Sequence, residues 1–269
     1  MKFMTVFALS VAFIAPAAAA PLKGKVVLTG SSTVAPLAAE LGKAFEKKHH
    51  EARIDVQSGG SSRGIADARS GLADIGMVSR ALKDEEKDLQ AFAIARDGVC
   101  VIIHKDNPIK ALDDAQVVAI YTGKITNWKE VGGKDAAITV VNKAEGRSTL
   151  ELFTHYFKLK NEDIKASIVI GDNEQGIKTV AGNPSAIGYV SIGTAEYDSQ
   201  HGVRIKLLPV GGVKASISAV RDGTFPLSRP LNLVVKTPPE GLVKAFVDFA
   251  RSSEVHELIK RQYFVAIKR

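Results

Sequence analysis

The chain alternates short apolar runs with segments whose apolar residues recur at helical spacing. Residues 25–29 are predicted to form a strand, and Leu37, Leu41 and Phe45 then mark one face of a helix. Repeated strand-then-helix order is typical of βαβ units, whose helices cover a mainly parallel sheet. The chain has 269 residues, 45% of them hydrophobic, which is enough for a substantial core in one large domain or two small ones. We therefore expect an α/β fold.

The alternation restarts near the middle of the chain, after His104. Strands are predicted at residues 54–57, 74–78, 99–104, 138–142, 167–170, 186–190 and 231–235, and helices at 64–70, 112–121 and 148–157 and twice near the C-terminus. Two α/β lobes explain this pattern better than one continuous sheet. We expect the chain to cross near His104 and to return near Arg229. Lobe I would then hold residues 20–103 and 229–269, and lobe II residues 104–228.

The N-terminus has the layout of a secretory signal peptide. Lys2 gives a positive start, residues 3–15 are almost wholly apolar, and residues 16–20 are small. A membrane anchor would need about 18 or more apolar residues, which this run does not supply. We expect residues 1–19 to be removed, and because no cysteine follows the apolar run we expect no lipid anchor. These features place the mature protein in a bacterial periplasm.

The charge balance favours an anionic partner. Lys and Arg total 36 against 29 Asp and Glu, a net charge of +7. These charges are scattered and aromatic residues are only 6%, which argues against nucleic acid as the partner. The single cysteine, Cys100, excludes an intramolecular disulfide and any metal site built from two cysteines. It lies in the predicted crossing strand, so we expect a buried, inert thiol. We expect neither a cofactor nor a metal.

Four loops place glycine and hydroxyl residues between the end of a strand and the start of a helix. They span residues 30–36, 58–64, 77–80 and 142–149. At such junctions the first helical turn has free backbone N–H groups and the positive end of its dipole, and glycine lets an anion approach the backbone. One such loop alone would be better explained by ordinary helix capping. Four in one chain, several of them with an arginine, predict a shared anion site.

Two other motifs suggest different chemistry. Residues 60–64 satisfy G-x-S-x-G, the nucleophile elbow of hydrolases, with Ser62 as the nucleophile. A triad would also need an acid and a histidine, and the later histidines lie in no recognisable setting. Residues 171–179 approach a phosphate-binding P-loop, but Ile177 stands where the lysine should be. We interpret this segment as a loop and the start of a helix.

The loops resemble those of the phosphate-binding proteins of bacterial ABC importers, over essentially the whole mature chain. The matching pieces are GSSTVAP at residues 30–36, SGGSSRGI at 58–65, ADIGMVSR at 73–80, YTGKITNWKEVGG at 121–133, NKAEGRSTLELF at 142–153, AIGYVS at 186–191 and PLSRPL at 226–231. The resemblance implies a periplasmic-binding-protein (Venus flytrap) fold with two crossing hinge strands. It implies a monomer that captures inorganic phosphate, delivers it to a membrane ABC permease, and catalyses no reaction.

The resemblance also implies which residues contact phosphate. Ser32 and the backbone of Thr33 match the family's first loop, Ser61 matches the second, and Gly146 and Thr149 match the fourth. The other candidates come from the composition of the loops. The expected ligand-binding residues are Ser32, Thr33, Ser61, Ser79, Arg80, Lys143, Gly146, Arg147, Ser148 and Thr149.

The chain departs from better-known members of this family within these loops. Arg80 replaces an aspartate, Lys143 replaces an arginine, Arg147-Ser148 replaces Ser-Gly, and Glu145 matches an acid that would pair with Lys143. The family's aspartate accepts a hydrogen bond from protonated phosphate and so helps to reject sulfate, whereas Arg80 cannot accept. If Arg80 and Arg147 both point inward, two guanidinium forks donate to one dianion. Alternatively, Arg80 is a surface residue or forms an ion pair across the lobes.

These departures keep other functions open. The same fold could bind another tetrahedral oxyanion such as sulfate or molybdate, and a secreted serine hydrolase that uses Ser62 is the alternative from a different class. We assign structural roles to three further residues. Trp128 and Tyr121 are expected to pack the second lobe, and Asp74 is expected to sit at a strand end or cap.

Overall fold

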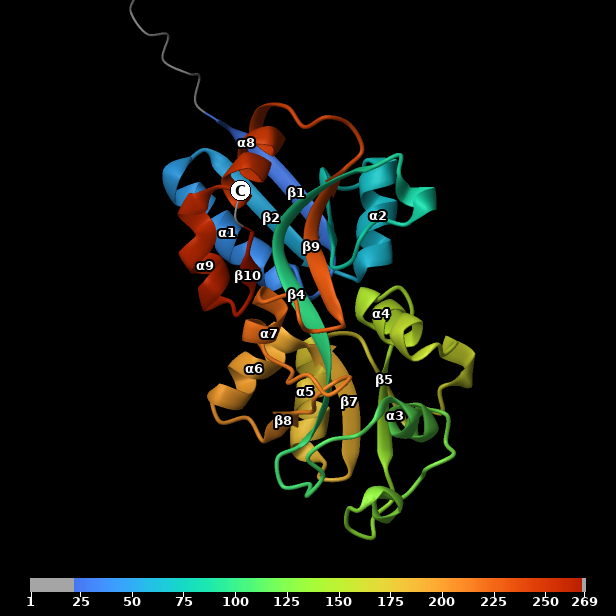
Figure 1. Cartoon of the computed structure of the whole chain (residues 1–269). Helices are drawn as coiled ribbons and strands as arrows, with labels where there is room; N and C mark the ends of the chain where they lie inside the picture. Colours follow the sequence, from blue (N-terminus) through green and yellow to red (C-terminus); the bar gives the residue numbers. More distant parts are fainter. Residues whose placement is uncertain (1–21, 268–269) are drawn as a thin grey trace, which may run out of the picture.

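The computed structural model describes residues 22–267, so the predicted signal peptide lies outside the described residues. Figure 1 shows two α/β lobes stacked end to end and joined by strands that pass between them. We call the lobe that contains β1 to β3 lobe I and the lobe that contains β5 to β7 lobe II. Within residues 22–267, no helix is long and apolar enough to cross a membrane.

Lobe I combines the first third of the chain with its C-terminal part. Its elements are β1 (Gly24–Gly30), α1 (Ala35–Lys48), β2 (Ala52–Ser58), α2 (Ser61–Ser70), β3 (Ile75–Val78), β9 (Ser228–Val235), α8 (Gly241–Ala250), α9 (His256–Arg261) and β10 (Val265–Ala266). The strand order is β2-β1-β3-β9-β4, and α2 lies on the opposite side of the sheet from α1, α8 and α9 (Figure 1). The C-terminal helices α8 and α9 therefore pack against α1, and α8 also contacts β1.

The periodic face of α1 forms the centre of the lobe I core. Leu37, Leu41 and Phe45 are at most 1% exposed, and the Phe45 ring meets the edge of Phe246 from α8 at 5.5 Å between centroids. Full burial of such a side chain contributes about 1.5–3 kcal/mol. This packing holds α1, and with it the loop that precedes α1, against the sheet.

Lobe II contains the middle of the chain. Its elements are α3 (Asp114–Tyr121), β5 (Thr139–Lys143), α4 (Ser148–Phe157), β6 (Ile168–Ile170), α5 (Asn173–Gly182), β7 (Ala186–Ser191), α6 (Ile192–Gln200), β8 (Ile205–Leu207) and α7 (Ile217–Arg221). Among the described residues, short 3₁₀ turns lie in lobe II at Trp128–Val131 and Asn161–Asp163, and in lobe I at Asp84–Glu86 and Ser253–Val255. The sheet continues in the order β4-β7-β5-β6, with β8 beside β4.

Aromatic side chains from several elements pack in the core of lobe II. Tyr189 stacks on Phe153 of α4 with ring centroids 3.8 Å apart, and Tyr121 lies 5.7 Å from Tyr189. Trp128 is 2% exposed, and its indole N–H donates to the Ser185 carbonyl at 2.9 Å. The predicted packing roles of Tyr121 and Trp128 are confirmed.

The long strand β4 (Gln90–His104) passes through both lobes. Its first part pairs with β9 and its last part, residues 99–103, pairs with β7, both antiparallel. The predicted strand at 99–104 is therefore only the second half of β4, and the expectation of a mainly parallel sheet is wrong. Parallel pairs occur within each lobe, but the crossing strands run against their neighbours. Cys100 in β4 is fully buried, and this burial raises the pKa of its thiol, as an inert role requires.

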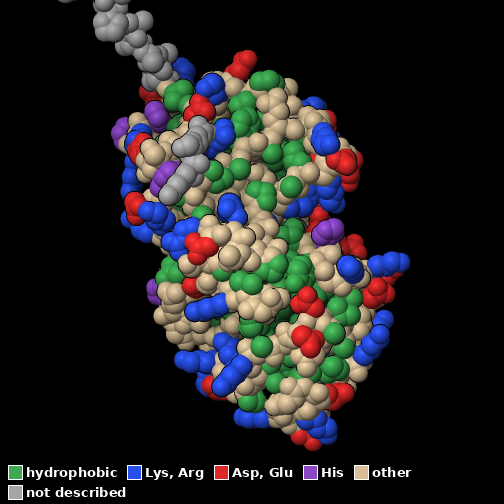
Figure 2. Space-filling view, in the orientation of Figure 1, with side chains coloured by type: hydrophobic (Ala, Val, Ile, Leu, Met, Phe, Trp, Pro, Cys, Tyr) green, Lys and Arg blue, Asp and Glu red, His purple; other side chains and the backbone are tan. Residues whose placement is uncertain are grey.

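On the face shown in Figure 2, Lys and Arg side chains are interspersed with Asp and Glu over both lobes. The net charge of +7 is thus not gathered there into one basic stripe. A dispersed charge of this kind supports solubility more than it defines a binding surface.

Candidate functional site

The four predicted loops meet between the lobes. Because β2, β1 and β3 are parallel neighbours, their carboxyl ends bring the first three loops to one edge of the lobe I sheet. The fourth loop, between β5 and α4, approaches this edge from lobe II. There the Gly146 carbonyl accepts a hydrogen bond from the Ser62 amide at 3.2 Å. The two lobes are therefore in contact at the predicted site.

Two glycines allow the ends of β1, β3 and α2 to approach closely. Gly30 has a φ of +129°, and a Cβ at this position would lie 2.3 Å from the Met77 carbonyl oxygen. A Cβ on Gly64 would lie 2.8 Å from the same oxygen. Larger residues would push these segments apart, so the glycines set the spacing of the first three loops.

At this spacing the serines of the three loops bind one another. The Ser31 hydroxyl donates to the Ser79 hydroxyl at 2.9 Å, and the Ser79 amide donates to the Ser61 hydroxyl at 3.2 Å. Ser31 also accepts from the amides of Thr33 and Val34 at 3.2 and 3.3 Å. Ser31 thus caps the turn that leads into α1. This is the helix-capping role that would explain one such loop without an anion.

A buried arginine that the sequence analysis did not identify lies at the centre of the site. Arg229 of β9 pairs in register with Asp97 of β4, and the two residues are 2% and 0% exposed. The Arg229 Nε and Nη2 atoms donate to Asp97 Oδ2 at 3.1 and 2.8 Å. The other carboxylate oxygen of Asp97 accepts from the Gly193 amide at 3.1 Å. Asp97 therefore holds the guanidinium in place and neutralises part of its charge.

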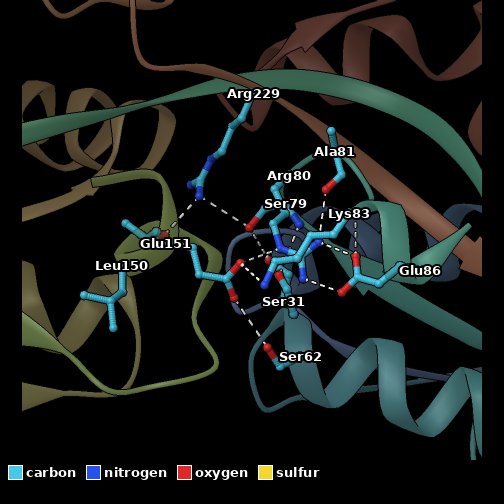
Figure 3. A network of polar contacts seen from close by, with 12 residues as sticks. Ser31, Ser62, Ser79, Arg80, Ala81, Lys83, Glu86, Leu150, Glu151 and Arg229 are labelled. Atoms are coloured by element: carbon cyan, nitrogen blue, oxygen red, sulfur yellow. Dashed lines mark hydrogen bonds and ion pairs between the residues drawn. The ribbon is translucent and has the colours of Figure 1, made fainter. Parts of the chain in front are cut away.

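The outer edge of the Arg229 guanidinium reaches hydroxyls from three loops. Nη1 donates to Thr149 Oγ1 at 3.0 Å and to Ser79 Oγ at 3.4 Å, and Nη2 donates to Thr33 Oγ1 at 3.2 Å. Figure 3 shows Arg229 extending from the crossing strands toward Ser79 and the start of α4. Thr149 belongs to lobe II, so Arg229 connects the two lobes through the site.

These contacts determine which way the hydroxyl protons point. Thr33 Oγ1 also accepts from the Asn173 amide group at 3.2 Å, so both of its lone pairs are used and its own proton is left to donate. Thr149 and Ser61 each accept from an N–H group and keep their protons for another partner. Ser148 Oγ is buried and has no hydrogen-bond partner within residues 22–267. The site therefore presents hydroxyl donors that need an acceptor.

Lys143 adds a buried amine to the site. It is 2% exposed, and its Nζ donates to Asn173 Oδ1 at 3.0 Å. Burial, with the nearby positive charges of Arg229 and Arg147, lowers the pKa of Lys143 to about 7. The expected pair between Lys143 and Glu145 is wrong, because the exposed Glu145 carboxylate accepts from the side chain of Asn161 at 3.1 Å.

Arg147 lies between the loops of the two lobes. A Cβ on Gly60 would come within 3.0 Å of Arg147 Cδ, and one on Gly171 within 3.4 Å of its Nη2. The Nε of Arg147 is buried and has no hydrogen-bond partner among the described residues. Lys143, Arg147 and Arg229 thus bring three basic side chains to the site. The acidic groups beside them are Asp97, which already binds Arg229, and Asp172, which acts on Lys143. This balance suits an anion.

Arg80 does not contribute its guanidinium in the expected way. Nη1 and Nη2 donate to the two carboxylate oxygens of Glu86 at 2.6 and 2.8 Å, and Nε lies 2.8 Å from Glu151 Oε2. Arg80 and Arg147 therefore do not both donate to one anion. The alternative, an ion pair across the lobes, describes Arg80 correctly, because Glu151 belongs to α4 of lobe II.

The structure also shows the positions of the remaining residues that the sequence analysis singled out. Ser32 is half-buried in the first loop, and its side chain forms no hydrogen bond with the described residues. Gly146 has a φ of +76° and contacts Ser62 across the lobes. The segment that approaches a P-loop is a loop followed by α5, and its Asn173 is a site residue that the sequence analysis missed. Asp74 accepts from the Val27 amide at 2.8 Å, which confirms its strand-end role.

The arrangement required of a serine hydrolase is not formed. Ser62 is exposed at the start of α2, and its hydroxyl donates to Glu151 Oε1 at 3.4 Å. Within residues 22–267, no hydrogen bond joins Ser62 to a histidine, so its hydroxyl lacks the histidine base of a Ser-His-Asp triad.

Comparison with known proteins identifies the class. A family model described as a PBP superfamily domain matches residues 15–254. The phosphate-binding protein PstS of Bacillus subtilis strain 168 is 30% identical over 241 residues, which are 88% of this chain and 78% of that protein. PstS of Staphylococcus haemolyticus is 32% identical over 228 residues, 80% of this chain and 72% of that protein. This chain belongs to the PBP superfamily and, within it, to the PstS family of phosphate-binding proteins.

Solved structures agree with this assignment. A Clostridium perfringens structure, described as a phosphate ABC transporter substrate-binding protein with bound phosphate, matches with a TM-score of 0.84 and 35% identity, covering 91% of this chain and 100% of that one. An ABC-type phosphate transport receptor from Vibrio cholerae matches with a TM-score of 0.74 and 29% identity, covering 90% of this chain and 100% of that one. The two-lobed periplasmic-binding-protein fold predicted from the loops is confirmed.

Proposed function

We propose that this protein captures inorganic phosphate between its lobes and delivers it to an ABC permease in the membrane, without catalysing a reaction. The observation that carries this proposal is the set of buried hydroxyls whose protons have no acceptor, arranged around Arg229. A tetrahedral oxyanion supplies acceptors in several directions at once. The bound phosphate of the Clostridium perfringens relative supports the choice of anion.

The proposed contacts come from both lobes. From lobe I they are Ser32, Thr33, Ser61 and Ser79, and from lobe II Lys143, Gly146, Arg147, Ser148 and Thr149, with Arg229 added from the crossing strands. Arg80 is left out, because its guanidinium is bound to Glu86 and Glu151. Closure of the lobes removes water from the anion, so donors from both sides strengthen together and the ligand stabilises the closed state.

The export, location and domain boundaries proposed for this protein follow the same family pattern. We propose that residues 1–19 are a signal peptide and that the mature protein works in the periplasm as a monomer without a lipid anchor. The proposed lobes are residues 20–103 with 229–269, and residues 104–228. The position of β9 supports this division, since it begins at Ser228 and returns the chain to the lobe I sheet.

Sulfate or molybdate is the second candidate ligand, and one observation favours it. A carboxylate that accepts from protonated phosphate would discriminate against fully ionised sulfate. In this site the Asp97 carboxylate is already bound by Arg229 and the Gly193 amide. Asp97 therefore has no free carboxylate oxygen with which to discriminate against sulfate.

Thermal shift of the ligand-stripped protein tests the proposal. Phosphate, sulfate, arsenate and molybdate are added separately, because a ligand that binds only the folded state stabilises it by RT ln(1 + [L]/Kd), about 2.7 kcal/mol at 100 times Kd. We expect a clear rise in melting temperature with phosphate. No shift at millimolar phosphate would refute the proposed function, and a shift with sulfate or molybdate alone would establish the second candidate.

A further inference from the structure

A second polar cluster lies beside the anion site and crosses from one lobe to the other. Glu151, in the first turn of α4, places Oε2 2.8 Å from Arg80 Nε and 3.4 Å from Lys83 Nζ. Its Oε1 accepts from the Ser62 hydroxyl at 3.4 Å. Figure 3 shows the Glu151 carboxylate between these three side chains. The carboxylate belongs to lobe II, whereas Arg80, Lys83 and Ser62 all belong to lobe I.

Arg80 is held in place within lobe I without Glu151. Glu86 binds both terminal nitrogens of Arg80, and its Oε2 also accepts from the Lys83 amide at 2.9 Å. Asn232 of β9 donates to the Arg80 carbonyl at 2.7 Å. Arg80 is 5% exposed, so its guanidinium is held against the sheet, and its Nε lies 2.8 Å from Glu151 Oε2 as an ion pair rather than as an aligned hydrogen bond. Such a preformed partner loses little freedom when a carboxylate arrives.

The charges of the cluster balance only when the lobes meet. Arg80 and Lys83 carry two positive charges and Glu86 one negative charge, which leaves lobe I with one unbalanced positive charge at this point. Glu151 supplies the matching negative charge. Within residues 22–267, the hydrogen bond and ion pairs of the Glu151 side chain are all with lobe I, so separation of the lobes breaks every one of them.

We propose that Glu151 is a latch that holds the lobes closed and thereby slows release of the anion. This inference rests on the proposed function, since it concerns the same closure. Glu151 is a positioning residue: it binds Arg80, Lys83 and Ser62, while the anion is held by the hydroxyls around Arg229. Because its contacts form only in the closed state, Glu151 acts on the rate of opening and leaves the encounter of anion and open protein unchanged.

The test compares Glu151→Gln and Glu151→Lys with the wild type. Glu162→Gln is the matched control, because Glu162 is an exposed lobe II glutamate whose ion pair with Lys160 stays within that lobe. Phosphate dissociation is followed by stopped-flow chase, and association by mixing. We expect dissociation to be about 3- to 10-fold faster in Glu151→Gln and faster again in Glu151→Lys, with association within about twofold of the wild type.

A second readout separates a latch from a merely structural residue. Spin or fluorescent labels, one on each lobe, report the distance between the lobes in the ligand-free protein. We expect the open population to increase in both Glu151 variants and to stay at the wild-type level in Glu162→Gln. We also expect high salt to speed phosphate release from the wild type and to have little effect on Glu151→Gln.

The outcomes distinguish the two proposals. Unchanged dissociation and unchanged lobe distance in Glu151→Lys would overturn the latch, even if phosphate bound well. A lower melting temperature with no change in dissociation would also overturn it and would make Glu151 a structural residue. If the wild type bound no phosphate, the proposed function would fail, and the lobe distance of the ligand-free variants alone would decide on the latch.

Discussion

The buried amine of Lys143 should make phosphate binding weaken steeply in alkaline solution. In the free protein, burial and the charges of Arg229 and Arg147 lower the pKa of Lys143 to about 7. A dianion beside Nζ favours the charged amine, so the pKa rises again on binding. Above the free-protein pKa, each binding event must therefore take up a proton, and affinity falls about tenfold per pH unit.

The magnitude follows from the lowered pKa. Inorganic phosphate is already a dianion above about pH 8, so its own ionisation adds little beyond that point. Between pH 8 and pH 9.5 the charged fraction of Lys143 in the free protein falls about 30-fold, for a pKa of about 7. The Kd for phosphate should rise by that factor, which corresponds to about 2 kcal/mol. Burial raises the pKa of Tyr121 and Tyr189, so these phenols stay neutral and do not contribute.

Isothermal titration across this pH range is the assay, in buffers of different ionisation enthalpy so that proton uptake is counted directly. We expect about one proton taken up per phosphate at pH 9. Lys143→Met is the control: it should bind more weakly at pH 7 and show no further loss between pH 8 and pH 9.5. A flat profile in the wild type, or the same slope in Lys143→Met, would refute this account of Lys143.

Three further predictions concern other groups of the site. Arg147→Ala should weaken phosphate binding by about 1.5–3 kcal/mol, the range for hydrogen bonds to a charged group; an unchanged Kd would place Arg147 outside the site. Asp97→Ala leaves the Arg229 guanidinium buried without its carboxylate, so denaturant unfolding should show a loss of about 3–5 kcal/mol, whereas a loss under about 1 kcal/mol would contradict the central role of this pair. Ser62→Ala should keep phosphate affinity within a few-fold, and neither it nor the wild type should hydrolyse a test ester; turnover that depends on Ser62 would revive the hydrolase alternative.

The loops of the site could be predicted because they follow from strand order alone. Glycine and hydroxyl residues at the ends of apolar runs reach one edge wherever parallel strands are neighbours. Ser79 was predicted from the composition of its loop, whereas Ser61 and Thr149 were predicted from the resemblance to the family's loops. The direction of the crossing strands was not predictable from periodicity, because parallel and antiparallel strands have the same alternation when both faces are buried.

The direction in which a long side chain points could not be predicted from the sequence either. Arg80 follows a serine in a predicted anion loop, but the acidic run at residues 84–86 lies one turn away and supplies Glu86 as its partner. Arg229 was noted only as the point where the chain returns to lobe I: it lies outside every glycine-rich loop and two residues before the predicted strand at 231–235, whereas β9 already begins at Ser228. The usable signal was the charge itself: an arginine within a buried strand requires a buried partner, and Asp97 on the other crossing strand is that partner.

A crystal structure of the protein with arsenate, located by its anomalous scattering, tests the central claim most directly. The account predicts one strong peak between the lobes, within hydrogen-bond distance of the hydroxyls of Thr33, Ser61 and Thr149 and beside the Lys143 amine. A peak elsewhere on the protein, or an arsenate bound by Arg80 in place of these hydroxyls, would contradict it.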